Sequence, residues 1–235
     1  KNIEMEAFKG SGEAQHDLAV VYTAGRAGVP QNFERAAYWF TKASNQGIAN
    51  ARYNLGVLYH QGLGVEQDLK KAIEWYQKAA QLGHAEAQYN LGIAYIEGIG
   101  VDYDPQRAAE YFESAAASGV PEAAFNLGLI YENGLTGEAQ PDEAILWYKT
   151  ASDLGNADAR NAMEQLAKNL NIKIEDIDSL IERIKTPAIE KQSQLSKIEP
   201  ATQTGGFPSA PQEVVAQIQD QLISFGLFPG PADGL

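Results

Sequence analysis

The sequence contains no cysteine, few basic residues and no long apolar run, and each absence excludes a class of function. Without cysteine the chain can form no disulfide, no thiolate zinc site and no thiol nucleophile. Its 18 Lys and Arg residues stand against 31 Asp and Glu, and the net charge of -13 disfavours nucleic acid and anionic membrane surfaces as partners. No run of about 18 apolar residues is present, so the sequence predicts no membrane span.

Motifs for catalysis and for cofactor binding are also missing. The three histidines, His16, His60 and His84, stand at no metal-ligand spacing. The paired glycines follow helical patterns rather than strands, which is the wrong order for a dinucleotide fingerprint. Asp104 directly precedes Pro105 and is better explained as a helix cap than as a calcium ligand. The sequence therefore predicts a protein that is not an enzyme and needs no metal or cofactor.

The sequence does contain an internal repeat, and each copy consists of two motifs in succession. The second of these motifs contains Trp or Tyr at positions 39, 75, 111 and 147 and Gly at positions 47, 83, 119 and 155. An earlier copy is offset by 37 residues, and a half copy begins at Ala159. Such a period indicates a stacked repeat architecture. The first motif recurs every 36 residues as ARYNLGVLYHQGLGV (51–65), AQYNLGIAYIEGIGV (87–101) and AAFNLGLIYENGLTG (123–137).

Each copy carries two amphipathic helical patterns, with apolar residues one turn apart on a single face. Glycines interrupt the first helices at positions 56, 92 and 128, where each costs up to about 1 kcal/mol relative to alanine. We therefore expect a neighbouring helix to pass too close for a Cβ atom. Two helices cannot bury such faces alone, so neighbouring pairs must stack into an all-α solenoid. The expected faces are Ala51, Leu55, Leu58 and Tyr59, then Ala72, Trp75, Tyr76, Ala79 and Ala80.

Punctuation residues mark the ends of these helices. Glycines at 62, 98 and 134 are expected to close the first helices, and glycines at 83, 119 and 155 the second. Pro105, Pro121 and Pro141 stand where a helix would begin, a position that tolerates the missing N–H.

The two motifs, A-x-x-x-L-G-x-x-Y-x-x-G-x-G-V and then K-A-x-x-W-Y-x-K-A-A-x-x-G, resemble the Sel1-like repeat, a relative of the tetratricopeptide repeat. The resemblance covers residues 13–166. The first copy departs from the pattern at Ala19 and in its turn, and the fourth departs in its turn. The resemblance implies a protein–protein interaction scaffold without catalytic activity.

One set of residues recurs on the first helix of each copy and is a candidate partner-binding surface. In related arrays the first helices line a concave wall. There asparagine can bond to the backbone of an extended peptide, and aromatic rings supply contact area. The alternative is that these residues only hold helix pairs together, since repetition alone is what packing predicts. The set comprises Asn54, Asn90, Asn126, Tyr53, Tyr89 and Phe125.

The segments outside the repeats differ from them in composition. Residues 1–12 are expected to end a preceding helix or to form an N-terminal cap, and residues 167–185 to form a capping helix. Residues 186–211, rich in Pro, Ser, Thr, Gln and Gly, are expected to be a linker. Residues 212–235 resemble the start of a bacterial peptidoglycan-binding domain, whose remainder would follow Leu235. The residues that carry this resemblance include Gln219, Gly230, Asp233 and Gly234.

This order of parts resembles the periplasmic region of bacterial scaffolds that organise the cell pole. The resemblance implies a periplasmic location, a protein or peptide partner in the groove, and peptidoglycan contact through the complete C-terminal module. Two alternatives stay open. The chain is a carbohydrate-binding or wall-processing accessory in which the repeats are a spacer, or it is a cytosolic adaptor whose terminal resemblance is accidental.

Overall fold

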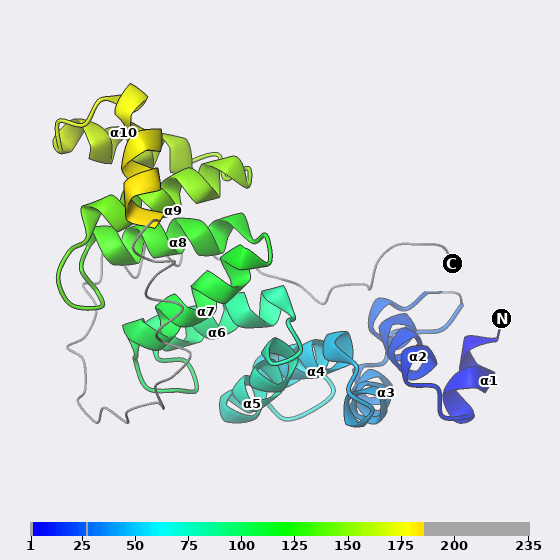
Figure 1. Ribbon diagram of the computed structural model, residues 1–235. Helices are drawn as coiled ribbons and strands as arrows, with labels where there is room; N and C mark the ends of the chain where they lie inside the picture. The colour runs from blue at the N-terminus through cyan, green and yellow to red at the C-terminus, as the bar shows by residue number, and fades with distance from the viewer. Residues whose placement is uncertain (1, 27, 186–235) are drawn as a thin grey trace, which may run out of the picture. The chain divides into compact units, whose positions relative to one another are not determined.

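The structure is a computed structural model that describes residues 2–26 and 28–185. Every regular element in these residues is helical, which confirms the predicted all-α solenoid (Figure 1). The chain continues as a helix over residues 177–185 to the end of the described part. The elements before it are α1 (Ile3–Phe8), α2 (Gly12–Ala24), α3 (Phe33–Asn45), α4 (Ala49–Gln61), α5 (Leu69–Ala80), α6 (Ala85–Glu97), α7 (Pro105–Ala117), α8 (Pro121–Glu132), α9 (Pro141–Asp153), α10 (Ala159–Asn169) and the 3-10 helix η1 (Ile174–Asp176).

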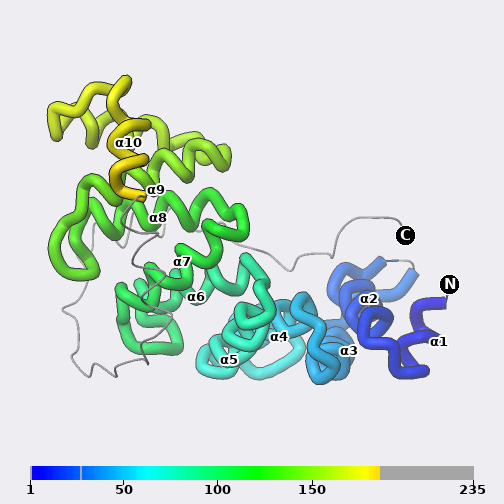
Figure 2. Tube along the Cα trace, viewed as in Figure 1, coloured from blue at the N-terminus to red at the C-terminus, as the bar shows by residue number. Residues whose placement is uncertain are grey.

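The described chain falls into two compact units. The first holds the residues up to Ala94 together with Gly98–Asp102, and the second holds Tyr95–Glu97 and the residues from Tyr103 on. Within each unit, helices that follow one another in sequence pack side by side (Figure 2). In the first unit α1 packs on α2, α2 on α3, α3 on α4 and α4 on α5. In the second, α7 packs on α8, α8 on α9 and α9 on α10.

The predicted helix ends are confirmed. Asp104 is the N-cap of α7, and its Oδ1 accepts a hydrogen bond from Arg107 N at 3.0 Å. All three helix-starting prolines lie in the first turn of their helices. Gly62 ends α4 in the left-handed conformation with φ 68°, and its N–H donates to Leu58 O. This conformation favours glycine and allows the chain to leave the helix directly.

The core of the described residues is built from many alanines together with larger aliphatic and aromatic side chains, largely on the expected faces. Leu55 and Leu58 are 1% and 0% exposed. The prediction of a core position is wrong in degree for Trp75, which is only partly buried and carries the Lys78 ammonium 4.2 Å from its ring centroid. The adjacent Tyr76, 2% exposed, occupies the interior instead.

The close helix approach predicted at the glycines inside the first helices is confirmed at two of them. A Cβ at Gly128 would lie 2.3 Å from the ring atoms Cδ1 and Cε1 of Tyr148. A Cβ at Gly56 would lie 2.7 Å from the same atoms of Tyr76. Real Cβ atoms essentially never approach so closely. The second helix of each pair therefore uses the space that glycine leaves on the first.

The flanking segments differ in part from expectation. Residues 3–8 form the separate helix α1. The capping helix predicted for residues 167–185 begins later, because α10 ends at Asn169 and Asn171 adopts φ 57°, which breaks the helix. This later helix nevertheless buries an apolar face at Ile177, Leu180 and Ile181. The linker at 186–211 and the segment at 212–235, with Gln219, Gly230, Asp233 and Gly234, lie outside the described residues.

Candidate partner-binding surface

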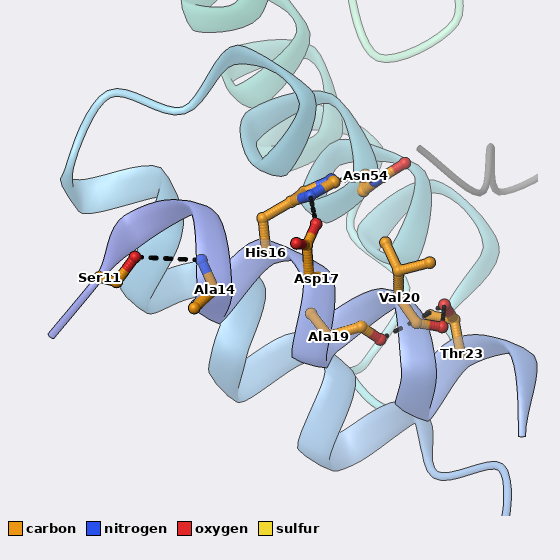
Figure 3. A network of polar contacts seen from close by, with 8 residues as sticks. All are labelled: Ser11, Ala14, His16, Asp17, Ala19, Val20, Thr23 and Asn54. Atoms are coloured by element: carbon orange, nitrogen blue, oxygen red, sulfur yellow. Dashed lines mark hydrogen bonds and ion pairs between the residues drawn. The ribbon is translucent and has the colours of Figure 1, made fainter. Parts of the chain in front are cut away.

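A buried polar contact joins α2 and α4, which are the leading helices of repeats one and two (Figure 3). Asn54 Nδ2 lies 3.4 Å from His16 Nε2, and His16 Nδ1 lies 3.3 Å from Asp17 Oδ1. His16 and Asn54 are 3% and 2% exposed. Because an amide nitrogen only donates, His16 Nε2 is the acceptor in the contact with Asn54. The contact thus couples α2 to α4 within the first unit.

Two of the predicted asparagines keep hydrogen-bonding capacity that the described residues do not use. The Oδ1 atom of Asn54 is buried and has no partner there. Asn126, in the second unit, is 0% exposed, and neither its Nδ2 nor its Oδ1 has a partner within the described chain. A buried polar group without a hydrogen bond typically costs about 1–3 kcal/mol. Their burial nevertheless favours the packing interpretation for Asn54 and Asn126.

Asn90 is in a different environment from its two counterparts. Its side chain is half-buried and interacts with the hydroxyl groups of Tyr53 and Tyr76. Burial raises the pKa of both tyrosines far above the usual value, and the contact with Asn90 opposes this rise. The Tyr53 hydroxyl has no partner in hydrogen-bond geometry within the described residues, so its interaction with Asn90 is weaker than a hydrogen bond of ordinary geometry. Asn90 is thus the predicted amide that solvent can still reach.

The predicted aromatic contact residues lie in the interior. Tyr53, Tyr89 and Phe125 are 1%, 0% and 8% exposed. The Tyr53 ring stacks on the His84 ring at a centroid distance of 4.5 Å, and the Phe125 ring lies 5.5 Å from that of Tyr148. This burial favours the packing interpretation for the aromatic positions. Their contact with a partner stays a prediction.

The sequence argued against His84 as a metal ligand but did not identify the contacts that it makes. His84 is the N-cap of α6, and its Nδ1 accepts a hydrogen bond from Ala87 N at 3.3 Å. The same nitrogen lies 3.3 Å from Glu86 Oε2. Burial lowers the pKa of His84, and the Glu86 carboxylate opposes this shift. The available signal was the position of His84 immediately before a helical pattern, where a capping side chain is expected.

The sequence also gave no indication of a contact between the two helices of one repeat. This contact joins the last turn of the first helix to the middle of the second helix. Tyr148 donates a hydrogen bond to Glu132 Oε2. At the matching positions 72 residues earlier, the Tyr76 hydroxyl lies 3.4 Å from His60 Nδ1. Burial is the main cause that raises the pKa of Tyr148, and the Glu132 carboxylate adds to it. The 36-residue register already aligned these positions, but it gave no sign that they touch.

Two classes of site are absent from the described residues. No group of three or more His, Cys, Asp or Glu side chains in residues 2–26 and 28–185 is placed to hold a metal ion. None of the helices in that part of the chain combines the length and the apolar character needed to cross a bilayer.

Comparison with known proteins gives one consistent result. The family model described as Sel1 repeat matches residues 12–48, 49–84, 85–120 and 121–156. The chain is similar to a Sel1 repeat protein from Oxalobacter formigenes, with 31% identity and a TM-score of 0.67 over 70% of this chain and 68% of that one. It is also similar to a protective antigen of uropathogenic Escherichia coli with an SLR fold, with 37% identity and a TM-score of 0.64 over 87% of this chain. The match spans 44% of the antigen's length. No curated protein matches the chain.

Proposed function

Because the chain belongs to the Sel1 repeat family, we propose that it is a non-catalytic scaffold that binds an extended segment of another protein along the first helices of its repeats. The observation that carries this proposal is the Asn90 side chain, a partly exposed amide on a first helix. An extended segment presents N–H and C=O groups at regular intervals, and an amide side chain can bond to both. Of the three asparagines, Asn90 is the one whose amide such a segment can reach.

The proposal treats the two units separately. In the first unit Asn90 is half-exposed and gives a segment direct access, while Asn54 stands 36 residues earlier on α4. In the second unit the corresponding amide, Asn126 on α8, is buried. The chain's net charge of -13 favours a neutral or basic segment over an acidic one, because charge complementarity governs encounter and selection.

The test selects peptides first and then removes the amides. Random peptides displayed on phage are selected on the full chain, and the best binder is labelled and titrated by fluorescence anisotropy. Replacing Asn54, Asn90 and Asn126 together by Ala should weaken binding at least tenfold while melting changes little. The control is Asn50→Ala, which removes an exposed amide from the first turn of α4 and should leave affinity unchanged. Unchanged affinity of the triple variant refutes the proposal. A triple variant that melts far earlier shows that the amides are structural.

A periplasmic location and contact with peptidoglycan are a further part of this proposal. They rest on the sequence of residues 212–235, outside the described part, and no comparison supports a wall-binding module there. Protein that carries the complete C-terminal module should co-sediment with purified peptidoglycan, and removal of that module from residue 212 on should abolish this. If residues 1–166 alone co-sediment, wall contact belongs to the repeats, and its assignment to the C-terminal module is wrong.

A further inference from the structure

A patch of exposed apolar side chains lies on α1 and α3 of the first unit. Met5, Phe8 and Tyr38 are 51%, 72% and 55% exposed. The rings of Phe8 and Tyr38 each meet the buried Trp39 edge-on, with centroid distances of 5.1 Å. Met5 stands three residues before Phe8 and therefore lies on the same face of α1. These three exposed side chains, two of which contact Trp39, are here called the α1–α3 patch.

The other repeats are an internal control for this patch. Helix α1 follows the register of the second helices, since Gln15 Nε2 donates to Ala7 O just as Gln88 Nε2 donates to Ala80 O. In the second helices of the four repeats, the position of Phe8 is occupied by Asn45, Gln81, Ala117 and Asp153. The position of Met5 is occupied there by Lys42, Lys78, Ser114 and Thr150. The position of Tyr38 is occupied by Glu, Glu and Leu. The apolar side chains are thus a local departure from the repeat pattern, and holding a helix pair together does not require them.

Charge around the patch differs from that of the rest of the chain. Residues 2–48 carry five acidic and four basic side chains, whereas residues 49–185 carry 21 acidic and 11 basic ones. The patch therefore lies in the nearly neutral part of a strongly acidic protein. A surface for an acidic partner is least repelled there, and a second copy of this chain is such a partner.

The pattern of charge on α3 is self-complementary. Glu34, Tyr38 and Lys42 follow one another at intervals of four residues, so they form one exposed stripe on the helix. The Lys42 ammonium lies 5.5 Å from the centroid of the Tyr38 ring. In an antiparallel pair of two α3 helices, the Tyr38 side chains of the two copies lie against each other. Glu34 of each copy then lies opposite Lys42 of the other copy, so two opposite-charge contacts form. The matching stripes of the other repeats do not combine opposite charges at their two ends with an aromatic residue between them. They read Lys–Glu–Lys, Gln–Glu–Ser and Asp–Leu–Thr.

We propose that the α1–α3 patch is a self-association surface, at which two copies of this chain pair through antiparallel α3 helices around a two-fold axis. Such an interface uses the same patch on both subunits, as two-fold symmetric contacts require. It uses second helices and α1, so it leaves the first helices free for the binding proposed above. Its small apolar area is typical of a weak dimer rather than of an obligate one.

Sedimentation equilibrium of the full chain between about 5 and 500 μM, a range suited to a weak interface, tests the proposal. The wild-type chain should shift from monomer to dimer. Tyr38→Glu, which places at position 38 the residue of the next two repeats, should weaken dimerisation at least tenfold without changing the circular dichroism spectrum. The matched control is Leu82→Gln, which removes an apolar side chain that is 49% exposed and outside the patch, and it should dimerise as the wild type does.

A charge swap tests the α3 pairing itself. Glu34→Lys and Lys42→Glu should each weaken self-association about threefold to tenfold, because each variant places like charges opposite one another. A mixture of the two variants should associate at least as well as the wild type, because both opposite-charge contacts form again. A wild-type chain that stays monomeric over the whole range overturns the proposal, as does undiminished dimerisation of Tyr38→Glu. Failure of the mixture to recover association overturns the antiparallel α3 pairing.

Discussion

Replacing Gly128 by Ala is expected to destabilise the second unit, although alanine is the better helix former. The new Cβ would lie 2.3 Å from Cδ1 and Cε1 of the Tyr148 ring and 2.9 Å from its Cζ. Non-bonded carbon atoms favour separations of about 3.5–4.0 Å, so the ring must move. Tyr148 is 0% exposed and its hydroxyl is bonded to Glu132, which leaves the ring little freedom to do so.

The expected change in the free energy of unfolding is the sum of two destabilising contributions and one stabilising contribution. Inserting one methyl group into a packed core costs about 1–3 kcal/mol, and this close approach belongs at the upper end of the range. The exchange of Gly for Ala in a helix interior returns about 1 kcal/mol. Loss of the hydrogen bond to the Glu132 carboxylate would add about 1.5–3 kcal/mol. We therefore expect a decrease in the free energy of unfolding of about 2 kcal/mol if that bond survives, and about 4 kcal/mol if it breaks.

Urea unfolding followed by far-UV circular dichroism measures this change. In a Tyr148→Ala background the ring is gone, so Gly128→Ala should stabilise by about 1 kcal/mol. The two effects together give a coupling energy of about 3 kcal/mol or more. As a control, Gly12→Ala would place a Cβ 3.2 Å from the Gln46 side chain, which is flexible enough to move. It should change stability by no more than about 0.5 kcal/mol. A neutral or stabilising Gly128→Ala in the wild-type background would refute the steric argument.

Three further outcomes follow from the buried hydrogen bonds and titrating groups. Tyr148→Phe should cost about 1.5–3 kcal/mol in urea unfolding, because it leaves the Glu132 carboxylate without its donor, and a neutral effect contradicts this role. His84 has a lowered pKa in the folded chain, so the unfolded chain binds the proton more tightly. Its stabilising contribution is present above the unfolded pKa of about 6.5 and is lost as pH falls through the folded-state pKa. His84→Asn retains a capping side chain and should flatten this pH dependence of urea unfolding, and an unchanged slope rejects the assignment. Burial raises the pKa of Tyr53, Tyr76 and Tyr148, so their contribution is present below the unfolded pKa of about 10 and is lost as pH rises above it. In a spectrophotometric titration these tyrosines should ionise only as the helices melt, and their ionisation while the circular dichroism is still native would exclude this.

The sequence predicted the repeat architecture and its helix ends because local signals encode them. Asp104 before Pro105 and the closing glycine Gly62 act within one or two turns of the backbone, so they are readable without a partner helix. The glycine at 128 was also informative, because an unfavourable residue in a helix requires a reason elsewhere. In that case the inference ran from a local cost to a tertiary contact.

Features that depend on two helices at once were harder to predict. The periodic pattern placed Trp75 and Tyr76 on one face, but it could not decide which of two adjacent large rings enters the core. The burial of Asn54 and Asn126 depends likewise on how closely neighbouring helices approach. The break near Asn171 had no glycine or proline to announce it. Amphipathic periodicity continued across it, so a single helix was the natural expectation.

The matched positions at the end of each first helix and the middle of each second helix have a consequence for the order of the repeats. The chain fills this position with His60 and Tyr76, then with Ile96 and Phe112, then with Glu132 and Tyr148. Transplanting the first helix of the third repeat into the fourth would bring isoleucine opposite the Tyr148 hydroxyl. A buried hydroxyl would then lose its acceptor, at about 1–3 kcal/mol. Although the backbone pattern is the same in every copy, the copies are therefore not interchangeable modules. Recombination among them, whether in evolution or in the laboratory, is expected to succeed only when both helices of a pair move together.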